Sequence, residues 1–443
     1  MVSAAEQLAQ NLNFAAFSKA DELKRRLWFT LGALIVFRLG TYIPLPGIDP
    51  QALSQMVQQN QGGLLGMFNA FSGGAIGRMA IFALNIMPYI SASIIVQILT
   101  TVVPSLEALK KEGESGRKQI NQYTRYGTVF LAAIQAYGLA VGLQASGNVV
   151  TNPGWFFQLT TVITLVGGTV FLMWLGEQIT ARGVGNGISL IIFAGIIAEL
   201  PAALVGTLEL GRQGALSAGL IIAMFIGVVV VIAFIVFMER AQRRLLVQYP
   251  KRQMGNKMFQ DSSSHLPLKL NTAGVIPPIF ASSLLLAPLS IAGLSGGTGP
   301  DWLNTVTALL GRGQPLFIAL YIFGIVFFAF FYTAIVFNPQ ETAENLKKYG
   351  GFIPGIRPGA RTAEYIDYVL TRITVIGAAY LAAVCILPEL LISSAGVPFY
   401  IGGTSLLIVV SVTMDTVAQI QSHLLAHQYE GLIKKAKLRG AKR

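Results

Sequence analysis

Residues 218–238 read AGLIIAMFIGVVVVIAFIVFM, a run of 21 residues without a charged side chain. A helix needs roughly 20 mostly apolar residues to cross about 30 Å of hydrocarbon, because each residue advances it by about 1.5 Å. The run therefore predicts a membrane-spanning helix. Together with this run, the chain contains ten apolar runs of this kind, at 27–43, 79–103, 126–143, 155–176, 187–205, 218–238, 270–294, 315–337, 373–392 and 401–420.

The composition agrees with an all-α polytopic membrane protein of ten transmembrane helices. Charged residues make up 12% of the 443 residues, apolar and aromatic types make up 53%, and the mean hydropathy is +0.61. An average soluble domain carries about 25% charged residues. A soluble globule and a disordered chain are thereby excluded, and the single cysteine, Cys385, excludes an intramolecular disulfide framework.

Positively charged residues are sorted along the chain. Of the 32 Lys and Arg residues, 28 lie in the first 26 residues, in every second segment between spans, or after the last span. The others are Arg38, inside the first predicted span, and Arg78, Arg212 and Arg312 in the alternate loops. Loops rich in Lys and Arg stay on the cytoplasmic side. We therefore expect both termini in the cytoplasm, and an even number of spans agrees, because it places both termini on the same side.

The predicted spans divide five and five near residues 206–214. Because five is odd, two halves with a shared fold would be inverted repeats, as in many transport proteins. Ten spans without symmetry remain an alternative, since no residue-level repeat is visible. The predicted organisation is a cytoplasmic segment at 1–26, a first half at 27–206, a second half at 207–420 with cytoplasmic loops at 239–270 and 338–372, and a basic tail at 421–443.

Residues 64–77, LLGMFNAFSGGAIG, are apolar and glycine-rich but too short to span a membrane. Irregular backbone at membrane depth is tolerated only where protein or water surrounds it. The sequence is equally compatible with a re-entrant segment that fills a cavity and with a loop that lies on the membrane surface.

The sequence contains no recognisable catalytic motif and no acidic or histidine residue placed to couple transport to an ion. There is no G-x-x-x-x-G-K-[ST] phosphate loop, and His423 and His427 lack the Glu of a zinc-binding H-E-x-x-H motif. We predict no enzyme activity, no cofactor and no metal. Ion-coupled carriers use buried Asp, Glu or His. Arg38 is the only charge well inside a predicted span, which argues against the alternative function, an inverted-repeat secondary solute transporter.

Three amides lie in apolar surroundings: Gln97, Gln135 and Asn271. Interhelical amide hydrogen bonds contribute only about 0.6–2 kcal/mol in membranes. These side chains therefore fit either structural contacts or a seam that can open. Pro88, Pro277 and Pro278 interrupt the second and seventh runs, and we expect them to kink those helices.

The basic loops 239–270 and 338–372 are larger than simple connections. Arg357 lies in GGFIPGIRPGARTAEY, where four Gly and two Pro predict an exposed, non-helical tip. Such loops could bind anionic lipid, ribosomal RNA or an acidic protein surface, or act only as topology signals.

Several long motifs resemble the bacterial SecY family, the channel subunit of the general protein translocon. They are FSGGAIGRMAIFALNIMPYISASIIVQ (71–97), KKEGESGRKQINQYTRYGT (110–128), GVGNGISLIIFAGI (183–196), HLPLKLNTAGVIPPIFASS (265–283), YTAIVFNPQETAENLKKYGGFIPGIRPG (332–359) and GGTSLLIVV (402–410). The resemblance covers nearly the whole chain in order. It fades in the first ~20 residues and in the outer loops 144–154, 207–217 and 295–314.

The resemblance implies an hourglass of two inverted five-helix halves with four kinds of site. Its pore ring would be Ile86, Ile90, Ile188, Ile192, Ile279 and Ile408. Its plug would include Leu64, Leu65, Met67, Phe68, Asn69, Phe71, Ser72, Gly73 and Gly74. Its lateral gate would include Ser91, Gln97, Gln135 and Asn271. Its motor or ribosome docking surface would include Arg240, Arg243, Arg244, Lys251, Arg252, Arg357, Pro358 and Gly359.

The resemblance also implies a location and partners. The chain would cross the bacterial cytoplasmic (inner) membrane many times and bind the small membrane subunits SecE and SecG. The motor SecA or a translating ribosome would drive an unfolded preprotein with a signal sequence through it, and anionic lipid would contact its basic loops. Independently of the resemblance, the spacing of Ile86 and Ile90, and of Ile188 and Ile192, places each pair on one helix face.

Overall fold

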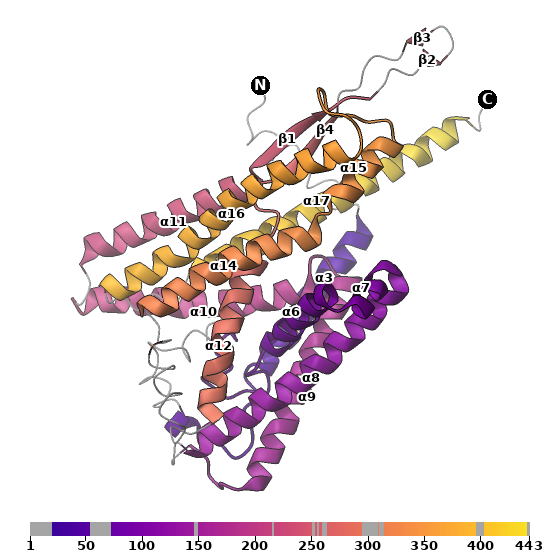
Figure 1. Cartoon of the computed structure of the whole chain (residues 1–443). Coiled ribbons are helices and arrows are strands. Elements are labelled where there is room, and N and C mark those ends of the chain that lie inside the picture. Colours follow the sequence, from indigo (N-terminus) through magenta and orange to yellow (C-terminus); the bar gives the residue numbers. More distant parts are fainter. Residues whose placement is uncertain are drawn as a thin grey trace. The chain divides into compact units, whose positions relative to one another are not determined.

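The structure is a computed structural model of the chain and describes residues 20–53, 72–145, 149–214, 217–249, 253–254, 257–258, 264–294, 309, 314–395 and 403–440 (Figure 1). Most of this backbone is helical. The helices are α3 (Asp21–Gly40), α6 (Met87–Val102), α7 (Pro104–Lys111), α8 (Glu114–Ala145), α9 (Trp155–Arg182), α10 (Gly187–Arg212), α11 (Ala218–Arg240), α12 (Ile276–Leu294), α14 (Pro315–Val336), α15 (Pro339–Lys348), α16 (Ala360–Ala395) and α17 (Gly403–Gly440).

Every predicted apolar run overlaps one of these helices. Within the described ranges, seven helices are long and apolar enough to cross a membrane, and α6 with α7 makes an eighth candidate that is bent by 97°. Helix α3 falls short because charged residues fill its first turns, and the apolar stretch found in α12, Ile276–Leu285, is too short. The polytopic helical architecture is confirmed, and the count of ten spans stays a prediction.

The prolines do not kink the helices as expected. Pro88 lies in the first turn of α6, and Pro277 and Pro278 lie in the first turn of α12. A proline in a first turn breaks no intrahelical bond, because the N–H groups there have no helical partner. These residues therefore start helices. The sharp bend lies instead at Val103, whose backbone is extended ahead of Pro104.

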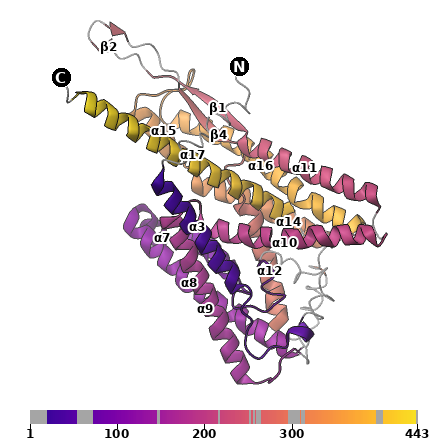
Figure 2. The ribbon, with the colours of Figure 1, turned by 180° about the vertical axis from the view of Figure 1, so that it is seen from behind.

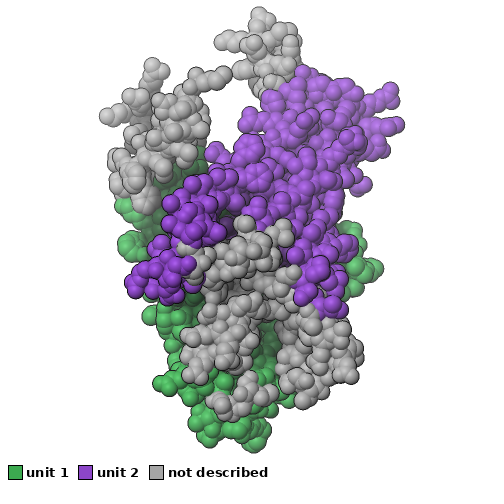
Figure 3. All heavy atoms as spheres, turned by 90° about the vertical axis from the view of Figure 1, so that its left-hand side faces the viewer, with its two compact units in different colours: residues 1–205, 288–307, 408–443 green, residues 206–287, 308–407 purple. Residues whose placement is uncertain are grey.

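The chain packs as two compact units, coloured separately in Figure 3. Unit 1 comprises residues 1–205, 288–307 and 408–443, and unit 2 comprises residues 206–287 and 308–407. One boundary coincides with the start of the 206–214 segment that divides the predicted spans five and five. Unit 1 also takes residues 408–443, however, and the two inverted halves remain a prediction.

Small residues let the helices of unit 1 approach closely. Helix α8 packs against both α6 and α9 (Figure 1), and α3 packs against α9 (Figure 2). Ala132, Ala136 and Ala140 of α8 repeat every four residues and are fully buried in the same apolar cluster as Met79 and Leu165. Small side chains at such a spacing allow the close backbone approach that membrane helices use in place of hydrophobic driving force.

Unit 2 contains β structure that the sequence analysis did not predict. Strands β1 (Gln242–Val247) and β4 (Ser264–Lys269) pair antiparallel, and the short strands β2 (Gln253–Met254) and β3 (Lys257–Met258) pair with each other. Leu245 and Leu268 of the longer pair pack with Ile353 and Ile366, and Gln248 exchanges backbone hydrogen bonds of 2.9 Å with Phe352. The two basic loops therefore fold against one another, and neither is a free connection.

Candidate functional site

The predicted pore positions at the start of α6 and of α10 form two pairs, and the members of each pair are one helical turn apart. Ile86 is the N-cap residue that precedes α6, and Ile90 lies within the helix. The Ile90 N–H donates to the Ile86 carbonyl at 3.1 Å, and Ile188 and Ile192 lie in the first turns of α10. Ile86, Ile90 and Ile192 are buried, and Ile188 is half-buried. Each pair thus presents two branched side chains on one face of its helix, within unit 1.

The other two predicted ring residues lie on different helices. Ile408 of α17 is buried within unit 1, and Ile279, in the first turn of α12, is half-buried and belongs to unit 2. The structure thus places five of the six isoleucines in one compact unit. The closed ring of six remains a prediction.

The predicted plug is described only from Ser72 onward, and its residues Leu64, Leu65, Met67, Phe68, Asn69 and Phe71 lie outside the described ranges. We call Ser72–Gly77 the root segment. From Ser72 to Ile86 the backbone is turned and not helical, and Gly73 and Gly74 have positive φ angles of 65° and 80°. Residues 72–76 are buried. Irregular backbone covered by protein supports the re-entrant interpretation over a surface-lying loop.

Two arginines converge on the root segment. Arg38 Nη1 donates to the Gly73 carbonyl at 2.6 Å, and Arg78 Nη2 donates to the same oxygen at 2.8 Å. Arg38, expected inside a span, lies in the last turn of α3. A cation is favoured there by the partial negative charge of the helix C-terminus.

The residues that hold these arginines were not predicted from the sequence. The Tyr42 ring lies under both guanidinium groups. Its centroid is 5.0 Å from the Arg38 Cζ and 4.2 Å from the Arg78 Cζ. The Thr41 carbonyl accepts from Arg78 Nε at 3.3 Å. The spacing of Arg38, Thr41 and Tyr42, three and four residues apart at the end of an apolar run, is a signal that could have identified the group.

Among the predicted gate residues on α6 and α8, Gln97 has a hydrogen-bond partner on its own helix. Gln97 Nε2 donates to Ser93 Oγ, one turn earlier in α6, at 3.5 Å, and Gln97 Oε1 is buried without a hydrogen bond from the described part of the chain. Ser91 and Gln135 are half-buried on α6 and α8. These contacts favour neither the structural nor the seam interpretation.

The side chain of Asn271 forms hydrogen bonds within unit 2, where α11, α16 and the turn before α12 meet. Its Nδ2 donates to Glu239 Oε1 at 2.7 Å and to the Gly274 carbonyl at 3.1 Å, and the residue is 5% exposed. Gly377 of α16 passes so closely that a Cβ there would lie 2.7 Å from the Leu270 carbonyl. Asn271 therefore ties the end of α11 to the turn that precedes α12.

Basic side chains lie on the surface of the folded loops. Arg240, Arg243 and Arg244 are exposed at and after the end of α11, and Arg357 and Pro358 are exposed on the other loop. Lys251 and Arg252 lie outside the described ranges. The tip that carries Arg357 is fixed to α16, because Thr362 Oγ1 donates to the Arg357 carbonyl and the Thr362 N–H donates to the Gly359 carbonyl, both at 3.0 Å. Gly359 has a φ of 108°, which favours glycine.

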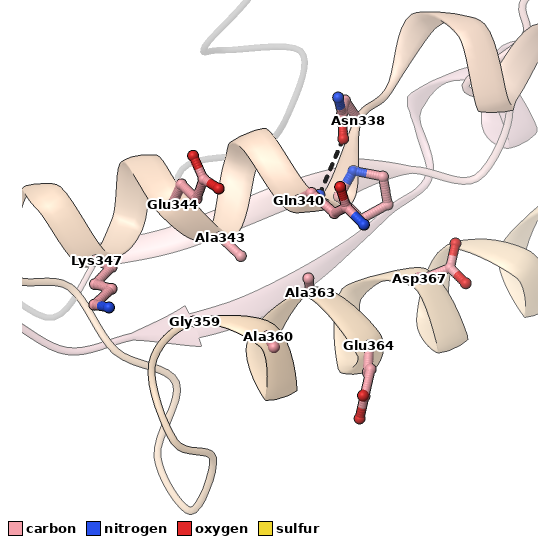
Figure 4. Close-up of a pocket in the computed structure, with 11 residues that line it drawn as sticks. Asn338, Gln340, Ala343, Glu344, Lys347, Gly359, Ala360, Ala363, Glu364 and Asp367 are labelled. Carbon is pink, nitrogen blue, oxygen red and sulfur yellow. Dashed lines mark hydrogen bonds between the residues drawn. The ribbon is translucent and has the colours of Figure 1, made fainter.

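A groove of about 700 Å³ lies beside this tip, between α15 and the first turns of α16 (Figure 4). Ala343 and Ala363 face one another across it, and their small side chains leave the space open. The acidic residues Glu344, Glu364 and Asp367 also belong to its lining. The predicted docking surface therefore places acidic and basic side chains next to each other.

The comparison with known families decides the assignment. The family model described as SecY matches residues 80–417. The chain belongs to the SecY family. The resemblance seen in the sequence motifs is thus confirmed.

SecY relatives and structures match nearly the whole chain. Protein translocase subunit SecY of Escherichia coli strain K12 is 57% identical over 423 residues, which are 95% of this chain and 96% of the relative. A solved structure of a protein conducting channel matches 90% of this chain and 92% of its own, with a TM-score of 0.66 and 16% identity. Sec61 in the canine ribosome-channel complex from the endoplasmic reticulum matches the same shares, with a TM-score of 0.65 and 17% identity. Both structures confirm a SecY-type fold.

Proposed function

We propose that the chain is the protein-conducting channel subunit of a Sec translocon. It passes unfolded preproteins with signal sequences across the bacterial cytoplasmic membrane and releases apolar segments sideways into the lipid. The observation that carries this proposal is the 57% identity with a protein translocase subunit over nearly the full length of both chains. An inverted-repeat solute carrier is not favoured, because neither the relatives nor the charges within the spans support one.

The physical basis of the resting state is an apolar constriction. Branched aliphatic side chains in a narrow ring exclude ions because water leaves the constriction. The same side chains require no specific hydrogen bonds from what passes, so many polypeptides fit between them. Ile86, Ile90, Ile188, Ile192, Ile279 and Ile408 would form this ring, and the residues from Leu64 to Gly74 would close it as a plug. Ser91, Gln97, Gln135 and Asn271 would line the lateral gate.

The channel itself is passive, and its partners supply the energy. SecE and SecG would complete the membrane complex, and SecA or a translating ribosome would dock on the cytoplasmic side. The relative seen in a ribosome–channel complex supports the ribosome as a partner. Arg240, Arg243, Arg244, Lys251, Arg252, Arg357, Pro358 and Gly359 would form the docking surface, and anionic lipid would neutralise the remaining basic residues. Both termini would lie in the cytoplasm.

Ion leakage through the resting channel tests the constriction. The chain, with its partner subunits in lipid vesicles, should leak more chloride when Ile90 or Ile408 is replaced by Asn, and most when all six ring positions are Asn. Ile197→Asn, on an exposed position of α10, is the matched control and should leave leakage unchanged. Unchanged leakage with six polar positions would contradict the apolar seal. Failure of the unaltered complex to transport a preprotein would contradict the channel function itself.

A further inference from the structure

The Gly73 carbonyl is an unusual acceptor, because two guanidinium groups donate to it. Arg38 comes from the end of α3 at a distance of 2.6 Å, and Arg78 comes from the turned segment itself at 2.8 Å. Hydrogen bonds from charged donors are about twice as strong as those between neutral groups. The main-chain oxygen of Gly73 is therefore held more firmly than an ordinary loop carbonyl.

Residues after α3 hold both arginines in place. The Tyr42 hydroxyl accepts from Arg38 Nη2 at 3.1 Å, and the Tyr42 ring lies beneath both guanidinium groups. Thr41 accepts from both arginines, through Oγ1 from Arg38 at 3.4 Å and through its carbonyl from Arg78 at 3.3 Å. Thr41 is fully buried, so this end of α3 is a fixed platform.

The root segment lies directly against α10. A Cβ on Gly73 would be 3.1 Å from the Gly195 Cα. A Cβ on Gly74 would be 2.5 Å from Glu199 Oε1 and 2.7 Å from Arg78 Nη2. Gly195 follows Ile192 by three residues, so the contact is one helical turn from a predicted pore position.

We propose that Arg38 and Arg78 form a latch on the Gly73 carbonyl that holds the root segment against α10. The two arginines are positioning residues, and this inference rests on the proposed channel function. The acceptor is a neutral carbonyl, and water can replace each of its hydrogen bonds when the contact opens. The latch is thus firm at rest and can be opened by a passing chain.

The accessibility of residue 72 measures the latch directly. Ser72 is 2% exposed, and a Ser72→Cys reporter, in the full chain with Cys385→Ser, should react slowly with a soluble maleimide in reconstituted vesicles. Arg38→Met and Arg78→Met should each raise the labelling rate about tenfold, since one hydrogen bond to a charged group shifts an equilibrium by at least about that factor. The double variant should be faster than either, and Lys at each position should lie between Arg and Met.

Matched controls separate the latch from a general loss of packing. Thr128 of α8 is fully buried in the same unit, and the labelling rate of Thr128→Cys should not change with any arginine variant. Arg212→Met, whose side chain is 82% exposed, should leave Ser72→Cys labelling slow. If the double Met variant does not accumulate, Tyr42→Leu tests the same latch at a residue that is 55% exposed, and it too should speed labelling.

The outcomes distinguish this inference from the function on which it rests. Labelling at the unaltered rate in the arginine variants and in Tyr42→Leu overturns the latch, even when the same vesicles transport preprotein normally. Equal acceleration of Ser72→Cys and Thr128→Cys also overturns it, since the arginines would then only stabilise the unit. Absence of preprotein transport with the unaltered arginines would instead overturn the proposed function.

Discussion

Asn271 has a structural role that its sequence context does not reveal. Its apolar neighbours fit either a structural contact or a seam that can open, and the family resemblance implies a place in the lateral gate. The structure shows its side chain bonded to Glu239, 32 residues earlier in the sequence. Sequence spacing predicts contacts within one helix, but it cannot predict which distant carboxylate meets an amide, because the packing of other helices decides this.

Removal of the Asn271 amide should destabilise unit 2. Asn271→Ala removes the 2.7 Å hydrogen bond to the Glu239 carboxylate at a position that is 5% exposed, which we expect to cost about 1–3 kcal/mol. Asn271→Asp should cost more, because it brings two carboxylates together. Thermal unfolding of the purified chain in detergent measures both. Thr272→Ala, at the half-exposed neighbouring position, is the control, and an equal fall in melting temperature there would contradict a special role for Asn271.

Arg38 differs from Asn271, because the sequence identified this residue as exceptional but could not predict its hydrogen-bond partner. Its position as the only charge well inside a predicted span identified it as exceptional. Its acceptor could not be predicted, because Gly73 carries no side chain and offers only a main-chain oxygen. The spacing of the isoleucine pairs was informative for a simpler reason, since helical periodicity alone places residues four apart on one face.

Helix α9 packs against the segment that precedes α6 through one glycine. A Cβ on Gly168 would clash with the Ile81 carbonyl oxygen, whereas a Cβ on the adjacent Gly167 would meet nothing within 4 Å. The sequence TLVGGTV does not show which glycine is needed. Only the direction in which α9 presents each residue to its neighbours distinguishes them.

The two glycines make a matched pair of variants. Gly168→Ala should destabilise unit 1 by about 1–3 kcal/mol, because the added methyl group overpacks a backbone contact. Gly167→Ala should be neutral or slightly stabilising, since alanine is the better helix former by up to about 1 kcal/mol. Thermal unfolding in detergent compares them. Equal melting temperatures for the two variants would show that α9 does not approach Ile81 as described.

The β hairpin of loop 239–270 is the main element that was not predicted from the sequence. Leu245 and Val247 are buried, and the residues beside them are exposed, which is the period-two pattern of a strand with one covered face. Their basic neighbours were interpreted as topology signals or as a binding surface for a partner, and the alternation was not used. The prolines were misjudged for a related reason, since a proline that starts a helix and one that kinks it look alike when the helix boundary is uncertain.

The distribution of charge is the property of the whole chain that the sequence predicted most directly. The net charge of +12 belongs mainly to segments between spans, and 28 of the 32 positive residues are assigned to one side. Single side chains gave no hint that two of these segments pack together. The structure adds that Gln248 pairs with Phe352 and that acidic side chains line the groove beside Arg357. A surface of mixed charge can orient a partner, whereas a uniform one only attracts it.

Arg357→Glu should weaken docking of the motor or ribosome without harming the membrane fold. Arg357 is exposed, and its side chain is not needed for the tip, which Thr362 holds through the Arg357 carbonyl. Loss of one attraction and gain of one repulsion should lower partner affinity about tenfold at low salt. The difference should shrink as salt is raised, because exposed charges are screened.

Binding of the partner to vesicles and preprotein transport measure the effect, and Arg212→Glu, on the predicted outer side, is the matched control. Normal transport at normal partner affinity would remove Arg357 from the docking surface, and a lowered melting temperature would show that its role is structural.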